Sequence, residues 1–92
     1  MVIGLVLATL TWNVMAQGTG EQDLMRAIKE DVFDERWDAV LAGAEKLISD
    51  FPQSPSLART MYYKARALHK LGRENEAVDA YGDFIKIGRA HV

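Results

Sequence analysis

The chain has 92 residues, enough for one domain, and its 13 acidic and 11 basic residues give a net charge of −2. This balance argues against general nucleic-acid binding. The chain has no cysteine, which excludes a disulfide framework, a thiolate metal site and a lipid-bearing N-terminal cysteine. The apolar content of 49 % is sufficient for a hydrophobic core.

The N-terminal segment is strongly apolar. Residues 2–10 form an apolar run, and Val14-Met15-Ala16 follows with small or β-branched residues at its first and last positions. This pattern predicts a secretory signal peptide over residues 1–16 and a linker over residues 17–20, although no Lys or Arg precedes the run. An uncleaved anchor and a first domain helix are the alternatives. Residues 2–16 are fewer than the ~20 needed to cross a bilayer, and they have almost no polar face.

The first helix of the mature chain is predicted from about Gly20 to Val32. Thr19 and Gln22 have the spacing of a capping box, in which each side chain binds the other residue's backbone N–H. Asp31 interrupts the apolar pattern of this helix. Its expected buried side chains are Leu24, Ala27 and Ile28.

The second helix has the clearest pattern in the chain. We expect Asp34 to be its N-cap and Pro52 to end it, because proline disfavours helical geometry in the residue before it. At 100° per residue its apolar positions lie within an arc of about 120°. These positions are Trp37, Val40, Leu41, Ala44, Leu47, Ile48 and Phe51.

A third and a fourth helix form a hairpin that turns at Gly72. Ser54 is the expected N-cap of the third helix, Pro55 takes its first position, and the helix runs to Leu71. Gly72 ends it in the left-handed conformation that glycine adopts without penalty. The fourth helix opens at residue 73 or 74 and ends near residue 88, so the helical domain spans residues 21–88 and residues 89–92 have the pattern of an interrupted continuation.

Apolar residues recur along both of these helices at three- and four-residue steps. In the third helix they are Leu57, Met61, Ala65, Leu68 and Leu71, and in the fourth they are Ala77, Val78, Tyr81, Phe84 and Ile85. We expect one interior to hold Trp37, Leu47, Leu68 and Phe84.

The pattern of the second helix returns 37 residues later in the fourth, where Leu41 aligns with Val78, Leu47 with Phe84 and Ile48 with Ile85. Fixed-period helical hairpins are typical of α-solenoids. The chain here resembles the tetratricopeptide repeat (TPR) on these residues: Trp37, Pro52, Ala65, Leu68, Gly72, Ala77, Tyr81 and Phe84. It departs from that motif at Val40, where alanine is usual, and at Arg89, where a proline is usual.

The resemblance is closest to bacterial envelope TPR proteins, such as the lipoprotein of the outer-membrane β-barrel assembly machinery and the Tol–Pal-associated repeat protein. It rests on the run from Leu47 to Pro55, on Tyr62-Tyr63 and on the run from Ala80 to Lys86. The resemblance implies an all-α fold of two antiparallel hairpins, four helices in all, stacked as a short α-solenoid. It also implies a periplasmic, non-enzymatic scaffold without a cofactor.

A basic stripe lies beside the apolar stripe of the third helix. Six residues occupy an arc of about 100° there, namely Arg59, Tyr62, Arg66, His69, Lys70 and Arg73. No acidic residue stands between Ala58 and Arg73. In TPR proteins this side of the helix lines the concave groove. Guanidinium groups bind carboxylates in bidentate fashion, so the stripe suits an acidic segment or a peptide C-terminus. The expected partner-binding residues are Arg59, Tyr62, Arg66, His69 and Lys70.

The alternative for this stripe is a solvated face whose charges pair with Glu35, Glu74 or Glu76 on neighbouring helices. Trp37 is expected to pack between helices rather than to bind a ligand, and Tyr63 and Tyr81 are also expected to be packing residues.

Catalytic and metal-binding patterns are weak throughout. No acidic residue accompanies His69 or His91 at ligand spacing, and no His–Asp pair stands ready to activate Ser54 or Ser56. Gly18-Thr19-Gly20 is too short for a phosphate-binding loop. We therefore predict a protein-interaction module rather than an enzyme, with no metal, no cofactor, no nucleic acid and no stable membrane insertion after cleavage of the signal peptide.

The second hypothesis is a structural element that self-associates or belongs to a longer repeat array. Repeats bury their faces on neighbours, and about three are needed for stability. Two repeats allow a homodimer through repeat stacking.

Overall fold

The computed structural model describes residues 20–90, and within that range the chain is all-helical without a β-strand. The first helix covers residues 20–33, and it is followed by α2 (Trp37–Asp50), α3 (Leu57–Lys70) and α4 (Glu74–Ala90). The prediction of an all-α fold with four helices is confirmed within this range. The expected signal peptide and the Thr19 cap lie outside the described residues. Gly20, the expected start of the first helix and also the last residue of the expected linker, is helical. α4 runs past residue 88.

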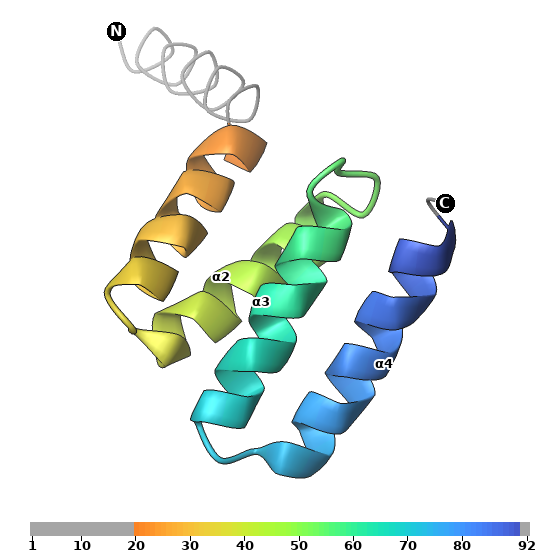
Figure 1. The fold of residues 1–92 in the computed structure, drawn as a ribbon. Coiled ribbons are helices and arrows are strands. Elements are labelled where there is room, and N and C mark those ends of the chain that lie inside the picture. Colours follow the sequence, from red (N-terminus) through yellow and green to blue (C-terminus); the bar gives the residue numbers. More distant parts are fainter. Residues whose placement is uncertain (1–19, 91–92) are drawn as a thin grey trace, which may run out of the picture.

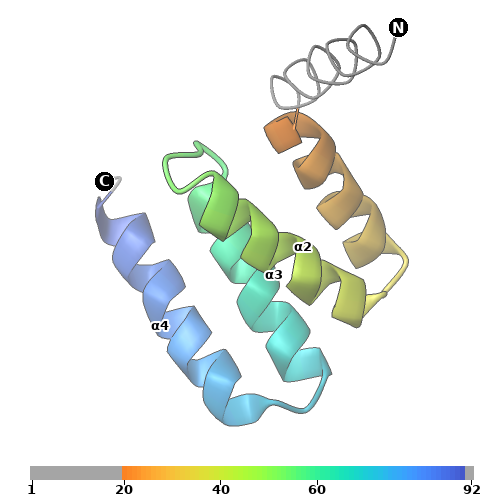
Figure 2. The ribbon, with the colours of Figure 1, turned by 180° about the vertical axis from the view of Figure 1, so that it is seen from behind.

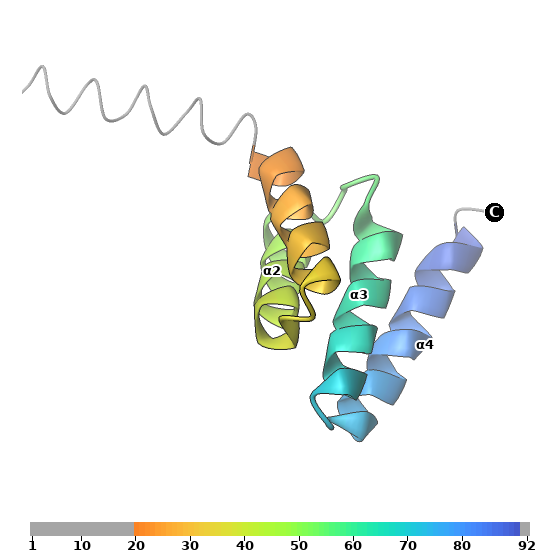
Figure 3. The same ribbon diagram turned by 60° about the vertical axis from the view of Figure 1, so that its left-hand side comes forward.

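The helices follow one another as neighbours in space. α3 lies between α2 and α4 in two opposite views (Figures 1 and 2). A third view places α4 at one edge of the assembly and the first helix beside α2 (Figure 3). None of the helices in this part of the chain has the length and apolar character required to cross a membrane.

The turn between α3 and α4 has the conformation predicted for Gly72. Its φ is +80°. The Gly72 N–H donates to the His69 carbonyl at 3.1 Å, and the Arg73 N–H donates to the Leu68 carbonyl at 2.9 Å. This pair of bonds is the Schellman motif, which satisfies the free carbonyls at a helix C-terminus.

The first helix also ends in a Schellman motif, and Glu35 takes the position that Gly72 has at the end of α3. Glu35 has a φ of +59°. Its N–H donates to the Val32 carbonyl at 3.1 Å, and the Arg36 N–H donates to the Asp31 carbonyl at 2.9 Å. The prediction of Asp34 as N-cap of α2 is wrong, because this motif occupies residues 34–36. Arg36 is the N-cap of α2, and its side chain makes no capping hydrogen bond.

The loop between α2 and α3 is closed by Ser54. Its Oγ accepts the Ser56 N–H at 3.0 Å and lies 2.5 Å from the Glu21 carboxylate, to which it donates. The bond to Ser56 is of the type expected from a cap, but residues 55–56 form a turn and α3 begins two residues later than predicted. Ser54 therefore ties this loop to the first helix.

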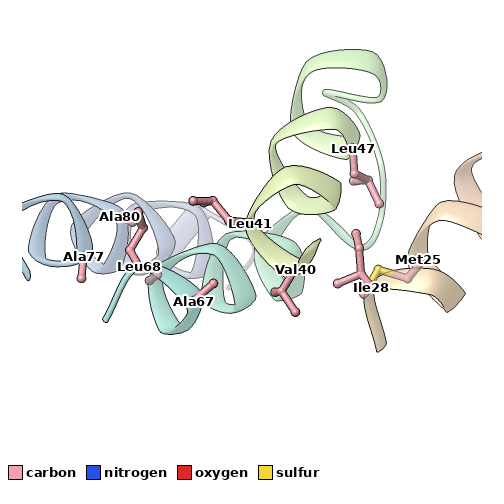
Figure 4. Packing of buried hydrophobic residues seen from close by; sticks show 10 residues of the cluster. Met25, Ile28, Val40, Leu41, Leu47, Ala67, Leu68, Ala77 and Ala80 are labelled. Atoms are coloured by element: carbon pink, nitrogen blue, oxygen red, sulfur yellow. The ribbon is translucent and has the colours of Figure 1, made fainter. Parts of the chain in front are cut away.

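The hydrophobic core receives side chains from all four helices (Figure 4). The apolar stripe predicted for α2 is confirmed by its four buried residues, Val40, Leu41, Ala44 and Leu47. In the first helix Met25 is buried in place of the expected Ala27, which is exposed. The buried cluster comprises Met25, Ile28, Val40, Leu41, Leu47, Ala65, Ala67, Leu68, Ala77 and Ala80.

The expected shared interior is therefore correct for three residues and wrong for the fourth. Leu47 and Leu68 are in the cluster, and Trp37 packs against it. Phe84 lies outside the cluster and contacts the Tyr62 ring instead, with ring centroids 5.5 Å apart. On α4 the buried positions of the core are taken by Ala77 and Ala80 instead.

The first helix approaches α2 very closely at Gly43. A Cβ atom on Gly43 would lie 2.9 Å from Cγ1 of Ile28, a side chain that is only 1 % exposed. Glycine is therefore required here by packing, and its conformational freedom is not used.

Two residues of the apolar pattern of α4 are on the surface. Val78 is 69 % exposed and Ile85 is 49 % exposed, whereas Ala77 and Ala80 are buried on the side toward α3. Periodicity marks these positions as apolar, but in the described part of the chain no element covers them.

Candidate interaction surface

The five residues predicted to bind a partner share the solvent-facing side of α3. Their neighbours along the helix, Thr60, Ala65 and Ala67, are buried. The side chain of Arg66 is half-buried, and the other four are exposed. We call this set the basic surface: Arg59, Tyr62, Arg66, His69 and Lys70.

The cations of the basic surface have no carboxylate partner among residues 20–90. The ion pairs of that region use Arg26, Lys46, Arg36 and Arg73 instead. The alternative hypothesis assigned Glu35, Glu74 or Glu76 as partners of these cations. That alternative is correct for Arg73, the sixth residue of the predicted stripe, which pairs with Glu76 at 2.6 Å. No ion pair joins Glu35 or Glu74 to the basic surface.

The indole ring of Trp37 in α2 contacts two cations of the basic surface. The guanidinium carbon of Arg66 lies 5.2 Å from the indole centroid, and the Lys70 ammonium lies 6.0 Å from it. Such cation–π contacts are worth about 0.5–1 kcal/mol at exposed sites. Trp37 packs against the core, as predicted, and in addition it orients two cations, which the sequence analysis missed.

Aromatic rings border the basic surface on the side toward α4. Tyr62 is 38 % exposed, and its ring lies 5.5 Å from Phe84 and 6.3 Å from Tyr81. Tyr63 and Tyr81 pack against the core, as predicted. An exposed aromatic edge next to unpaired cations offers both apolar area and charge to a ligand.

Acidic side chains gather on a different side of α3, around Lys64. A shallow hollow of about 200 Å³ there is lined by these residues, among others: Glu45, Lys64, Glu76, Asp79 and Asp83. Negative charge from α2 and α4 thus stands apart from the basic surface.

The Arg73–Glu76 pair changes the titration of both groups. The hydrogen bond from Arg73 holds the pKa of the Glu76 carboxyl below its usual value. The same hydrogen bond raises the pKa of Arg73.

One exposed residue was missed by the sequence analysis. Phe33 lies one residue beyond the predicted end of the first helix at Val32. In the structure it is the last residue of that helix and is 87 % exposed. With Arg26, Lys29, Glu30 and Asp34 it lines an open hollow. The 37-residue repeat could have indicated this exposure, because it aligns Phe33 with Lys70, an exposed residue of the basic surface.

Other chemistry finds little support in this part of the chain. Within residues 20–90 no three His, Asp or Glu side chains are grouped so that they could hold a metal ion. The carboxylates of Asp31 and Asp34 pair with Arg36.

Comparison with known proteins leaves the chain unassigned. No family model matches it. No similar curated protein is found, and no similar solved structure is found.

Proposed function

We propose that this chain is a non-enzymatic protein-interaction module that binds an acidic segment of a partner on the basic surface. The observation that carries the proposal is a set of cations on one face of α3 that have no carboxylate partner among residues 20–90, although acidic residues line the opposite side. An isolated surface ion pair contributes only about 0–1 kcal/mol. Fold stability therefore gives little reason to cluster cations in this way.

The geometry suits a carboxylate-bearing peptide. Trp37 holds Arg66 and Lys70 in place before a ligand arrives, which reduces the side-chain entropy lost on binding. Arginine takes a carboxylate through two parallel N–H···O bonds. The Tyr62 ring supplies adjoining apolar area.

The proposal includes a TPR-like stack of the two hairpins. Support comes from the turns at Glu35 and Gly72, which have the same hydrogen-bond pattern and stand 37 residues apart, the period of the sequence repeat. In such a stack the first-helix face that carries Phe33 would extend the basic surface.

The proposed location is the periplasm of a bacterial cell envelope. Its support is the apolar run and the Val14-Met15-Ala16 site of the sequence. Expression in a Gram-negative host, followed by N-terminal sequencing of the protein, tests this: export predicts a new N-terminus at Gln17 in the periplasmic fraction. Retention of Met1 in the cytoplasm would contradict it.

Fluorescence anisotropy with labelled peptides tests the binding function. The probe is a peptide with several Asp and Glu residues and a free C-terminal carboxylate. One control peptide has Asn and Gln in their place, and another has an amidated C-terminus. We expect the acidic peptide to bind and its affinity to fall as salt rises. The amidated form distinguishes recognition of a C-terminus from recognition of acidic side chains.

The double substitution Arg59→Ala/Arg66→Ala assigns the binding to the basic surface. Its matched control is Lys46→Ala/Lys64→Ala, which removes the same charge from two cations outside the basic surface, one paired with Asp50 and one in the acidic hollow. We expect at least a tenfold loss of affinity in the first and little change in the second. Equal effects of the two, with helicity retained in both, would show that the basic surface is only a solvated face.

The second candidate is a self-associating element or one unit of a longer repeat array. The observation that favours it is the exposure of Val78 and Ile85 on α4. Sedimentation of the chain over a range of concentrations tests it.

A further inference from the structure

The outward side of α4 carries a stripe of five residues with an acid at one end, a base at the other, and apolar or small residues between them. Glu74 stands at its N-terminal end, Arg89 at its C-terminal end, and Val78, Gly82 and Ile85 lie between them. At 100° per residue the five fall within about 80° of the helix circumference. We call this set the α4 stripe.

The complementary residues of the α4 stripe are placed symmetrically about one point on the helix. The midpoint between Glu74 and Arg89 falls between residues 81 and 82, and so does the midpoint between Val78 and Ile85. When two such helices pair antiparallel about a two-fold axis at that midpoint, the acid of each faces the base of the other. The apolar residues then face each other as well.

We propose that this chain forms a symmetric dimer through antiparallel pairing of α4 with the α4 of a second copy. In this arrangement Glu74 pairs with the second copy's Arg89, Val78 packs against its Ile85, and the two Gly82 residues flank the axis. A two-fold interface of this kind brings the same patch of both subunits together.

Gly82 supports a close approach at the axis. A Cβ added there meets no described atom of its own chain within 4 Å, in contrast to Gly43. Packing inside the protomer therefore does not account for a glycine in the middle of α4, where it weakens the helix. Small residues allow two helix backbones to approach closely, and an α4–α4 contact would use this one.

The first hairpin shows that this face is suited to packing. Leu41 and Ile48 of α2 stand 37 residues before Val78 and Ile85. Leu41 is buried and points toward Leu68 and Ala80, and Ile48 is half-buried (Figure 4). Val78 and Ile85 keep the apolar character of these positions while 69 % and 49 % exposed.

Charge complementarity selects a second copy as the occupant. Glu74 and Arg89 are exposed, and neither takes part in an ion pair within residues 20–90. In the dimer Glu74 of each copy pairs with Arg89 of the other, which gives two ion pairs without a further component. It is formed by α4 and is separate from ligand capture by the basic surface, so its failure leaves the proposed binding function standing. It specifies the geometry of the self-association named as the second candidate.

Cysteine cross-linking of the full chain tests the register, because the natural sequence has no cysteine. Gly82→Cys places two thiols beside the axis, and we expect an intermolecular disulfide under mild oxidation. Glu74→Cys alone places its thiols about 22 Å apart along the helices, at 1.5 Å per residue, far beyond disulfide reach. It should cross-link only when mixed with Arg89→Cys.

Charge exchange tests the interface by sedimentation equilibrium. Glu74→Arg and Arg89→Glu each bring like charges together and should weaken the dimer several-fold. The double exchange Glu74→Arg/Arg89→Glu should restore it. Ile85→Asp should weaken it at least tenfold with the helical circular dichroism unchanged, since Ile85 is on the monomer surface.

The N-terminal segment is identical in all these variants, so association through it would be insensitive to them. Three results would overturn the proposal. They are a monomer at all concentrations, self-association unaffected by Ile85→Asp and by the single charge changes, and cross-linking of Glu74→Cys by itself as efficient as that of Gly82→Cys.

Discussion

Glu35 and Gly72 stand 37 residues apart and adopt the same left-handed backbone conformation, with φ values of 59° and 80°. Each donates its N–H to the carbonyl three residues earlier, and the residue after each donates five residues back. The next helix also begins alike, with Val40 and Ala77 donating to Arg36 and Arg73. The two turns are thus one backbone design, built once with glycine and once with glutamate.

The glutamate version of this turn is strained, and Glu35→Gly should relieve the strain. A non-glycine residue in the left-handed region costs about 1–2 kcal/mol. We expect Glu35→Gly to stabilise the chain by about 1 kcal/mol, seen as a rise in melting temperature of roughly 4–8 °C. Thermal denaturation followed by circular dichroism measures it.

The reverse change at the other turn provides the control. A Cβ at Gly72 meets nothing within 4 Å, so Gly72→Ala introduces backbone strain without a steric clash. It should destabilise the chain by about 1–2 kcal/mol. A neutral Glu35→Gly together with a costly Gly72→Ala would mean that the glutamate side chain offsets its own strain.

Gly43 and Gly82 should respond to alanine in opposite directions. A methyl group at Gly43 would lie 2.9 Å from Ile28 Cγ1, so Gly43→Ala should destabilise the chain by about 1–3 kcal/mol. Gly82 has open space around it, so at dilutions where the chain is monomeric Gly82→Ala should stabilise it by about 0.5–1 kcal/mol. Urea denaturation of both variants measures the difference.

A second substitution tests whether contact with Ile28 causes the destabilisation by Gly43→Ala. Replacing Ile28 by alanine removes the atom that the new methyl group meets. The cost of Gly43→Ala should therefore shrink in an Ile28→Ala background, because substitutions in contact are not additive. An unchanged cost would place the clash elsewhere.

The contact between Trp37 and Arg66 should contribute measurable coupling. In a double-mutant cycle with Trp37→Leu and Arg66→Met we expect an interaction energy of about 0.5–1 kcal/mol. Arg59 has no such contact with the indole ring, so the same cycle with Arg59→Met should give a value near zero. Equal coupling in both cycles would indicate a general charge effect and not a stacked pair.

Acid should release the Arg73–Glu76 pair. The hydrogen bond from Arg73 lowers the pKa of Glu76 in the folded chain. A depressed pKa gives a contribution to stability that is present above the unfolded value, about 4.3, and is lost as the pH falls through the folded value. Carboxyl chemical shifts followed by NMR should give a pKa for Glu76 below the unfolded value. In Arg73→Met the pKa of Glu76 should return toward that value. A pKa that does not change in Arg73→Met would exclude the Arg73 hydrogen bond as the cause.

Local signals in the sequence predicted the helices well because they act within a few residues. Pro52 and Gly72 stop helices by their own backbone chemistry, and the apolar period of α2 marks its buried face. Asp34 was misassigned for a local reason too. Its residue type suits an N-cap, but the positive φ of Glu35 next to it is rare for glutamate and is not announced by composition.

For residues 20–90 the sequence by itself determined an all-helical fold, the places where its helices end, and a face of α3 that is rich in cations. Periodicity states which side of a helix is apolar or charged, because that follows from 3.6 residues per turn. It does not state what that side meets. Only the tertiary structure decided that Ile28 presses on Gly43, that Trp37 lies under Arg66, and that Val78 and Ile85 stay on the surface. Those contacts join residues distant in the chain, and they depend on how the helices pack.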